Sequence, residues 1–353
     1  KAPVPYPPVL HSLASASTIT WLIHQKFELS IPLYRQEKEW EALGLRLSRA
    51  TMSNWLLVVY RDWLVHIVHR LKLELLKQRY LHIDETHVQV LKEPGRKNTS
   101  DSYMWVYCSI RDAVNPIRYF EYQPGRSGKY PEAFLREYEG YIHTDAYSGY
   151  NAVSGVKRCL CYTHLRRAFV DALPKDIHNS EASKPAEAIL RLNQLFNIES
   201  ELEALPPDQK KKERLIREKP LLEAFWSWAE KSAIGELPKS KLSKAFHYAL
   251  NNREGFWNYL EDGNCSISNS LAENCIRPFV IGRKNWLFSG SPKGAEASAG
   301  IYTLVETAKA NGLAPMKYIK YILSDMPGSA FLEHPEYLDD YLPWNPLVKE
   351  FCR

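Results

Sequence analysis

Three carboxylates in separate parts of the chain are the residues best suited to chemistry. Asp84 lies in YLHIDETHVQV (80–90), Asp145 in HTDAYSGYNAV (143–153) and Glu273 in SLAENCIRP (270–278). Carboxylates that face one point repel each other and raise each other's pKa unless a cation lies between them. Because Mg²⁺ prefers oxygen ligands, a fold that brings these residues together would form a magnesium site.

Taken singly, each carboxylate has an ordinary explanation. An Asp in a strand is more often an edge or turn residue, and a Glu at a helix start usually compensates the helix dipole. Residues 80–90 alternate between apolar and polar side chains, which predicts a strand. Successive strand residues point to opposite faces, so Asp84 and Glu85 cannot both hold one metal ion. We expect Asp84 to be the ligand and Glu85 to have a supporting or opposite-face role.

The segments around these residues predict a mixed α/β fold. Strands are expected at 80–90, 103–110 and 117–123, then a helix near 130–138, strands at 141–144 and 157–162, and a helix at 163–173. This βββαβ order belongs to the ribonuclease H-like fold, in which helices cover a mixed sheet. In such a sheet the first and fourth strands can be neighbours, so Asp84 and Asp145 could meet.

Cations and aromatic residues follow Glu273. Arg277 lies one helical turn later, and Arg283, Lys284 and Trp286 come next. A carboxylate beside such a row suits a metal ion next to a phosphate backbone. Two metal ions about 4 Å apart can activate a water or a 3′-hydroxyl at a phosphodiester. With Lys293 and Arg49, these residues form the candidate DNA-binding set.

The remaining chain is expected to divide around this core. The predicted segments are an extended Pro-rich arm (1–16), a helical N-terminal region (17–79), the first part of the catalytic core (80–179), an all-helical insertion (180–262), the last part of the core with Glu273 (263–326) and a C-terminal tail (327–353). Within 32–57, a charged helix, a break at Gly44 and a helix capped by Ser48 outline a helix-turn-helix. Two packed helices without DNA contact explain the outline equally well. The run from Lys210 to Arg214 is expected to be a solvated helix face.

Composition narrows the class of protein. The 353 residues carry a formal charge of +5, and their six cysteines form no C-x-x-C pairs. This argues against a disulfide framework or a zinc ribbon and fits a reducing cytoplasm. No membrane span or signal peptide is expected, and the start at Lys1 suggests that an upstream region is missing. A tyrosine recombinase would need an Arg/His cluster around one Tyr, which is not found.

Four motifs together resemble the insertion-sequence-66-type bacterial transposases, which are DDE transposases with a ribonuclease H-like core. These motifs are HIDET (82–86), HTDAYSGYNAV (143–153), CYTHLRRAF (161–169) and the long block from Ala272 to Leu313. IPLYRQEKEWEALGLRLSRATMSNWL (31–56) and LPWN (342–345) extend the similarity over nearly the whole chain.

The resemblance implies that Asp84, Asp145 and Glu273 form the catalytic triad and bind two Mg²⁺ ions, which Mn²⁺ can replace. It implies cleavage at the terminal inverted repeats and strand transfer into target DNA. A homo-oligomer on paired ends, nucleoid association and element-encoded accessory proteins are expected with it. Cys161 and His164 form a C-x-x-H element, and we expect this pair to have a supporting role near the site. Asn269 is expected to have a supporting role as well. A buried Cys and a capping His are the alternative for that pair.

Two departures from the family pattern keep other functions open. Ser268 and Ser270 flank Asn269 where the family commonly has Asp and Asn, and a Cys-rich zinc-binding segment is absent. Altered loop geometry before Glu273 would give a DNA-binding derivative with impaired catalysis. A ribonuclease H-like nuclease or resolvase would share the triad but would form no joined product.

Overall fold

The computed structural model describes residues 6–174 and 183–353. The beginning of the predicted arm (1–5), the end of the first core segment (175–179) and the beginning of the insertion (180–182) lie outside the described residues. The chain folds as two compact units. The first comprises residues 1–78, 84–130 and 272–353, and the second comprises residues 79–83 and 131–271.

The first unit begins with the predicted helical region. Its helices are α1 (Ala16–Ile23), η1 (His24–Glu28), α2 (Leu33–Ala42), α3 (Arg49–Val59), η2 (Tyr60–Leu64) and α4 (Val65–Leu76). Gly44 has φ of +85° and separates α2 from α3, a backbone conformation that glycine adopts without strain. Ser48 caps α3 and accepts a hydrogen bond from the Thr51 amide. The predicted break and cap are therefore confirmed.

A mixed sheet connects these helices to the rest of the chain, as the sequence predicted. Its strands are β1 (Tyr80–Val90), β2 (Asp101–Ser109), β3 (Arg118–Gln123), β4 (Gly140–Thr144), β5 (Val156–Leu160) and β6 (Phe288–Ser289). Their order is β3-β2-β1-β4-β5, and β6 pairs with β1. β2 and β3 are antiparallel, whereas β4 is parallel to both β1 and β5. β1 passes from the second unit into the first between Ile83 and Asp84.

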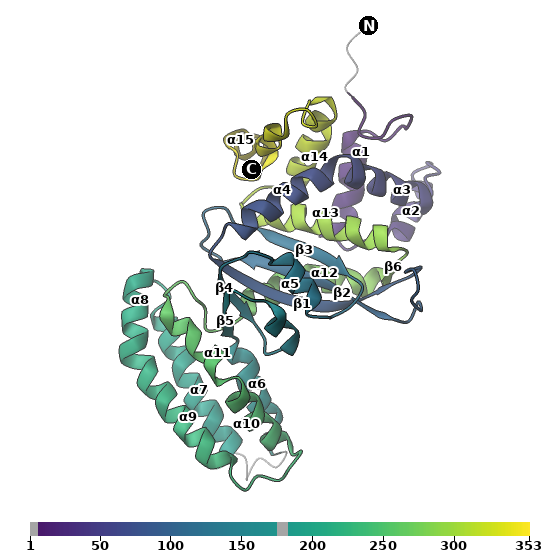
Figure 1. Cartoon of the computed structure of the whole chain (residues 1–353). Helices are drawn as coiled ribbons and strands as arrows, with labels where there is room; N and C mark the ends of the chain where they lie inside the picture. The colour runs from purple at the N-terminus through teal and green to yellow at the C-terminus, as the bar shows by residue number, and fades with distance from the viewer. Residues whose placement is uncertain (1–5, 175–182) are drawn as a thin grey trace. The chain divides into compact units, whose positions relative to one another are not determined.

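The C-terminal helices complete the first unit. They are α12 (Ser270–Trp286), α13 (Pro292–Ala310), α14 (Pro315–Asp325), η7 (Met326–Gly328), η8 (Pro335–Tyr341) and α15 (Pro346–Cys352). α13 runs along β3 (Figure 1). The Thr303 hydroxyl accepts a hydrogen bond from the Phe120 amide at 2.8 Å, and the Thr307 hydroxyl accepts one from the Arg118 amide at 3.1 Å. Two threonine side chains one helical turn apart thus provide hydrogen-bond acceptors for these two amides at the outer edge of β3.

The second unit contains β4, β5 and a group of helices. These are α5 (Lys129–Phe134, from Pro131 onward), η3 (Ser148–Ala152), α6 (Tyr162–Asp171), α7 (Lys184–Glu201), α8 (Pro207–Glu213), η5 (Arg214–Glu218), α9 (Lys219–Ala233), α10 (Lys241–Asn251), α11 (Arg253–Trp257) and η6 (Asn258–Glu261). Helices α6 to α10 pack as a bundle (Figure 1). Its core contains Phe169, Phe225, Trp226 and Phe246, all buried. The predicted insertion is helical in its described residues.

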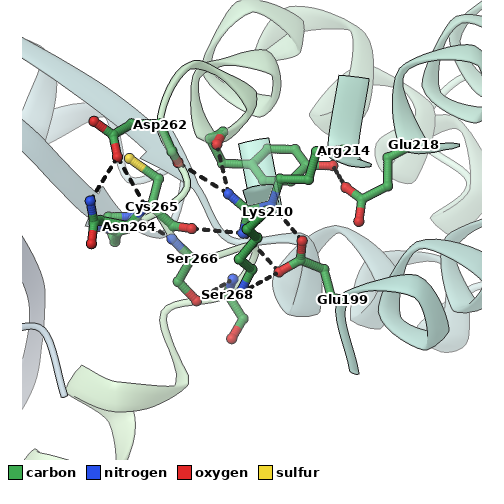
Figure 2. Close-up of polar contacts among 11 residues, drawn as sticks. Glu199, Lys210, Arg214, Glu218, Asp262, Asn264, Cys265, Ser266 and Ser268 are labelled. Carbon is green, nitrogen blue, oxygen red and sulfur yellow. Dashed lines mark hydrogen bonds and ion pairs between the residues drawn. The ribbon is translucent and has the colours of Figure 1, made fainter. Parts of the chain in front are cut away.

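The charged run in this bundle departs from the prediction. Lys211 and Lys212 are exposed as expected, but Arg214 is fully buried. Its Nε and Nη2 form a two-pronged ion pair with Glu199 at 2.6 and 2.8 Å. Its remaining donors reach the carbonyl oxygens of Tyr259, Asp262 and Cys265 at 2.8–3.1 Å (Figure 2). A paired carboxylate and three carbonyls offset the cost of burying the guanidinium, so the solvated-face prediction is wrong at Arg214.

Among the described residues, no helix is long and apolar enough to cross a membrane.

Candidate functional site

The pairing of β1 with β4 determines where the two aspartates fall. The strands are parallel, with Tyr80, Leu81 and His82 opposite Tyr141, Ile142 and His143. The His82 and His143 rings stack with their centroids 4.2 Å apart. Asp84 lies two residues after His82 within β1, and Asp145 lies two residues after His143, directly beyond the end of β4. Each aspartate thus follows a stacked histidine by the same number of residues.

The loop that carries Asp145 is fixed by hydrogen bonds within the second unit. The Asp145 carboxylate accepts a hydrogen bond from the Tyr147 amide at 2.9 Å. Arg158 of β5 donates to the carbonyl oxygens of Asp145 and Tyr147 at 2.6 and 2.8 Å, and to the Thr144 hydroxyl at 2.7 Å. Arg158 therefore holds the turn after β4. Sequence reasoning missed this residue, although a cation inside the apolar run KRCLCY was an available signal.

The neighbours Asp84 and Glu85 have different roles. Asp84 accepts a hydrogen bond from the Glu85 amide at 2.9 Å. The Glu85 side chain is 2% exposed and forms an ion pair with Arg126 at 2.6 Å. A guanidinium thus compensates the Glu85 carboxylate, and its supporting or opposite-face role stays a prediction.

Asn269 connects β1 to the beginning of α12. Its side-chain amide donates to the Ile83 carbonyl at 2.8 Å, and its side-chain oxygen lies 3.0 Å from His82 Nδ1. Its backbone amide donates to Cys161 Sγ at 3.1 Å. Asn269 is buried and directly precedes α12, whose first turn contains Glu273. Ser268 and Ser270 hydrogen-bond to each other through their hydroxyls at 2.7 Å.

The cysteine of the C-x-x-H element, Cys161, makes structural contacts. Cys161 is buried at the N-cap of α6, and its sulfur accepts the Asn269 hydrogen bond. The carbonyl oxygen of Cys161 accepts a hydrogen bond from the His164 amide at 3.2 Å, which begins the helix. Cys161 thus joins α6 to the segment that leads into α12. The supporting role predicted for the His164 side chain stays a prediction.

The predicted DNA-binding residues fall into three groups within the first unit. Arg283 donates to the Thr86 hydroxyl at 3.1 Å, and Thr86 lies on the same side of β1 as Asp84 because strand side chains alternate. Burial lowers the pKa of Arg283 from its usual value. Arg49 and Trp286 line a cavity of the first unit. The remaining three, Arg277, Lys284 and Lys293, are exposed on α12 and α13.

One cluster with metal-binding residue types was not anticipated. His143, Cys159 and Cys265 are buried in the second unit, with potential ligand atoms within 4.8 Å of one another. His143 Nδ1 donates to the Leu81 carbonyl at 3.1 Å, and its Nε2 accepts from the Ser266 amide at 2.9 Å. A hydrogen bond from Cys159 lowers the pKa of Cys265 to about 6. Because both ring nitrogens already have backbone partners, the cluster serves to attach the loop before α12 to β4.

A model of the transposase IS66 family matches residues 11–297. The chain belongs to this family.

Curated relatives of the transposase come from Sinorhizobium fredii (strain NBRC 101917 / NGR234), and each is described as uncharacterized. Protein y4hP is 26% identical over 98% of this chain and 64% of its own length. Protein y4qI is 28% identical over 94% of this chain and 63% of its own length. Protein y4jD is 25% identical over 98% of this chain and 68% of its own length. The chain therefore spans just under two thirds of the first two relatives.

Proposed function

We propose that this transposase cleaves DNA at the ends of its element and transfers the freed 3′-hydroxyl into target DNA. In this proposal Asp84, Asp145 and Glu273 hold the catalytic metal ions in a ribonuclease H-like core. The register of β1 and β4 carries the argument. Two carboxylates that follow a registered pair of residues in parallel strands continue in the same direction along the sheet. The stacked histidines indicate the shared face, because Asp84 alternates onto the face of His82.

The donor set fits a hard divalent cation. All three side chains offer carboxylate oxygens, which Mg²⁺ and Mn²⁺ prefer to sulfur or nitrogen. Backbone amides hold one oxygen of each aspartate, from Glu85 and from Tyr147, so both carboxylates are oriented before any ion binds. When bound, the metal ions would supply an activated water or 3′-hydroxyl and stabilise the leaving oxygen.

The other residues of the site position these carboxylates and the DNA. Arg158 fixes the turn of Asp145, and Asn269 fixes the segments that lead into Asp84 and Glu273. Arg283, with exposed Arg277 and Lys284 on the same helix, is placed to neutralise backbone phosphates. Two element ends must be joined, so we propose that the chain acts as a homo-oligomer on paired ends. Accessory proteins of the element would act on this assembly.

The proposal is tested with purified protein, DNA carrying the element's terminal repeats, and Mg²⁺. Asp84→Asn, Asp145→Asn and Glu273→Gln are each expected to lower cleavage and joining roughly 10³-fold or more, about 4 kcal/mol of transition-state stabilisation. Binding of the terminal DNA should survive. Glu85→Gln is the matched control, because the Glu85 carboxylate forms an ion pair with Arg126. This variant should keep cleavage activity.

The products separate this function from its alternatives. Cleavage that persists in Asp84→Asn would rule out the triad. Binding by the unmodified chain without any cleavage would favour a DNA-binding derivative. Ser268 and Ser270, which depart from the family pattern before Glu273, are the reason for considering that alternative. Cleavage without joined element–target molecules would favour a nuclease or resolvase.

A further inference from the structure

The first unit contains a cavity that the proposed chemistry does not use. Its volume is about 700 Å³, and its lining comes from η1, α2, α3, Lys92 just beyond β1, the end of α12, β6 and the first half of α13. This volume lies within the range of pockets that hold small ligands. The cavity is separate from the carboxylates, so it needs an occupant of its own.

The charges of the lining favour an anion. Lys26, Arg49 and Lys92 line the cavity, and its described lining includes no Asp or Glu. The Lys26 ammonium lies 3.8 Å from the centre of the Trp286 ring, and burial lowers the pKa of Lys26 to about 8. Among the residues that the structure describes, no carboxylate pairs with Lys26. The Glu37 carboxylate accepts a hydrogen bond from the Arg49 backbone amide at 2.9 Å but is not part of the described lining. Cations gathered in a lining without an acid are the arrangement expected for a phosphate.

The aromatic residues of the lining favour a base. Tyr34 is 40% exposed and Phe288 is 44% exposed, although both line the cavity. Lys26 lies close against the Trp286 ring, whereas the Arg35 guanidinium lies farther from the Tyr34 ring, 5.6 Å from its centre. Tyr34 and Phe288 are therefore the more exposed rings of the lining. Nucleobases stack on aromatic side chains regardless of sequence, and stacking is the usual way to bind an unpaired nucleotide.

The position of the cavity relates it to the strand that the proposed site would hold. Trp286 lies thirteen residues after Glu273 in α12, which is roughly 20 Å along a helix. β1 ends at Val90, two residues before the lining residue Lys92. Val90 lies six residues after Asp84, which is also roughly 20 Å along a strand. At about 3.4 Å per nucleotide of a duplex strand, both paths correspond to about six nucleotides.

We propose that this cavity binds one unpaired nucleotide of a DNA strand, about six nucleotides from the phosphate that is cut. Its base stacks on Tyr34 and Phe288, and Lys26, Arg49 and Lys92 neutralise its own and adjacent phosphates. The inference rests on the proposed function only for the source of the strand and for the spacing. Binding itself requires neither metal ions nor cleavage.

The test compares three probes in a buffer with EDTA, which prevents cleavage. They are a duplex with one extrahelical 2-aminopurine, the same duplex fully paired, and free dAMP. The extrahelical probe is expected to bind roughly tenfold more tightly than the paired duplex, with its fluorescence quenched on stacking. Tyr34→Ala with Phe288→Ala should remove both the preference and the quenching while leaving affinity for the paired duplex unchanged. Tyr337→Ala, an exposed aromatic in η8, is the matched control.

A second variant tests the phosphate contact without changing the rings. Lys26→Gln should weaken binding of the extrahelical probe and reduce the salt dependence of its affinity by about one counterion. Lys320→Gln, at an exposed position in α14, should do neither.

Equal affinity for the two duplexes, or a preference that survives loss of both rings, would overturn the proposal. Affinity for dAMP equal to that for the extrahelical probe would instead assign the cavity to a free nucleotide. Because these measurements exclude cleavage, failure here is distinguishable from failure of the triad.

Discussion

The side-chain amide of Asn269 donates a hydrogen bond of 2.8 Å to the carbonyl oxygen of Ile83, the residue immediately before Asp84. Asn269 also immediately precedes α12, in which Glu273 occupies the first turn. One buried amide thus fixes two chain segments that each lead into a proposed metal ligand. An amide serves well here because it donates to a carbonyl and accepts from His82 at once.

The first prediction concerns this amide. Asn269→Ala should lower the free energy of unfolding by roughly 1–3 kcal/mol, because the Ile83 carbonyl and His82 lose their buried partner. It should also lower DNA cleavage more than DNA binding, since the proposed ligands lose their alignment. Urea denaturation and the terminal-DNA assay measure the two effects. Asn274→Ala, on the exposed side of α12, should change neither, and equal behaviour of the two variants would contradict the assignment.

A second prediction concerns Arg214, the buried arginine of the helical bundle. Arg214→Met should destabilise the protein by roughly 3–5 kcal/mol, because the buried Glu199 carboxylate loses its two-pronged partner and keeps only the Lys210 ammonium, 3.7 Å away. The carbonyl oxygen of Tyr259 in η6 and those of Asp262 and Cys265 in the loop before α12 lose a donor as well. Chemical denaturation followed by Trp fluorescence gives the change.

Arg217 provides a matched control for this variant. It lies three residues later, is 36% exposed and pairs with Glu201 at the surface. Exposed ion pairs contribute about 0–1 kcal/mol, so Arg217→Met should have little effect. If Arg214→Met and Arg217→Met lower the free energy of unfolding equally, the burial of Arg214 has no energetic consequence and this interpretation is wrong.

The third prediction is a pH dependence that comes from Glu218. Burial, and then the nearby Glu199 carboxylate, raise the pKa of Glu218 to about 8. Tyr259 donates a hydrogen bond to it at 2.5 Å, and Arg214 and Tyr162 lie in its surroundings. The folded protein therefore binds a proton that the unfolded chain releases near its ordinary pKa of 4.5. This stabilisation is complete below about pH 4.5 and is lost as the pH rises through about 8.

Glu218→Gln isolates this contribution, because the amide retains the shape of the protonated acid but does not titrate. Between pH 6 and 8 the unmodified protein should lose stability relative to the variant by up to about 1.4 kcal/mol per pH unit. Glu121, whose pKa burial raises to about 7, titrates in both proteins and cancels in the difference. Parallel stability curves over this range would contradict a neutral Glu218.

The sequence was most informative where local pattern and tertiary environment agree. Alternation in 80–90 predicted β1 with its observed bounds, and Gly44 and Ser48 marked the break and cap between α2 and α3. These signals depend on side-chain direction, backbone freedom and local hydrogen bonds. Such properties are contained within a few consecutive residues.

The residues that the sequence did not reveal are held by partners distant in the chain. Arg214 stands in a run of charges, and its burial depends on Glu199 and on carbonyls about fifty positions later. Arg158 depends on a turn that begins thirteen residues earlier. A charge pattern in one window contains no information about such partners, so a buried arginine and a solvated one look alike in it.

The last prediction concerns the outer edge of β3. An edge strand exposes unpaired amides, and here the Thr303 and Thr307 hydroxyls accept hydrogen bonds from the amides of Phe120 and Arg118. Valine has nearly the shape of threonine but no acceptor. Thr303→Val and Thr307→Val should each lower the free energy of unfolding by roughly 1–3 kcal/mol, and hydrogen exchange should accelerate at the amide that each variant frees. Ser298→Ala removes an intrahelical hydroxyl of α13 and should leave both amides protected. Unchanged exchange at Phe120 and Arg118 would show that α13 covers β3 by apolar packing alone.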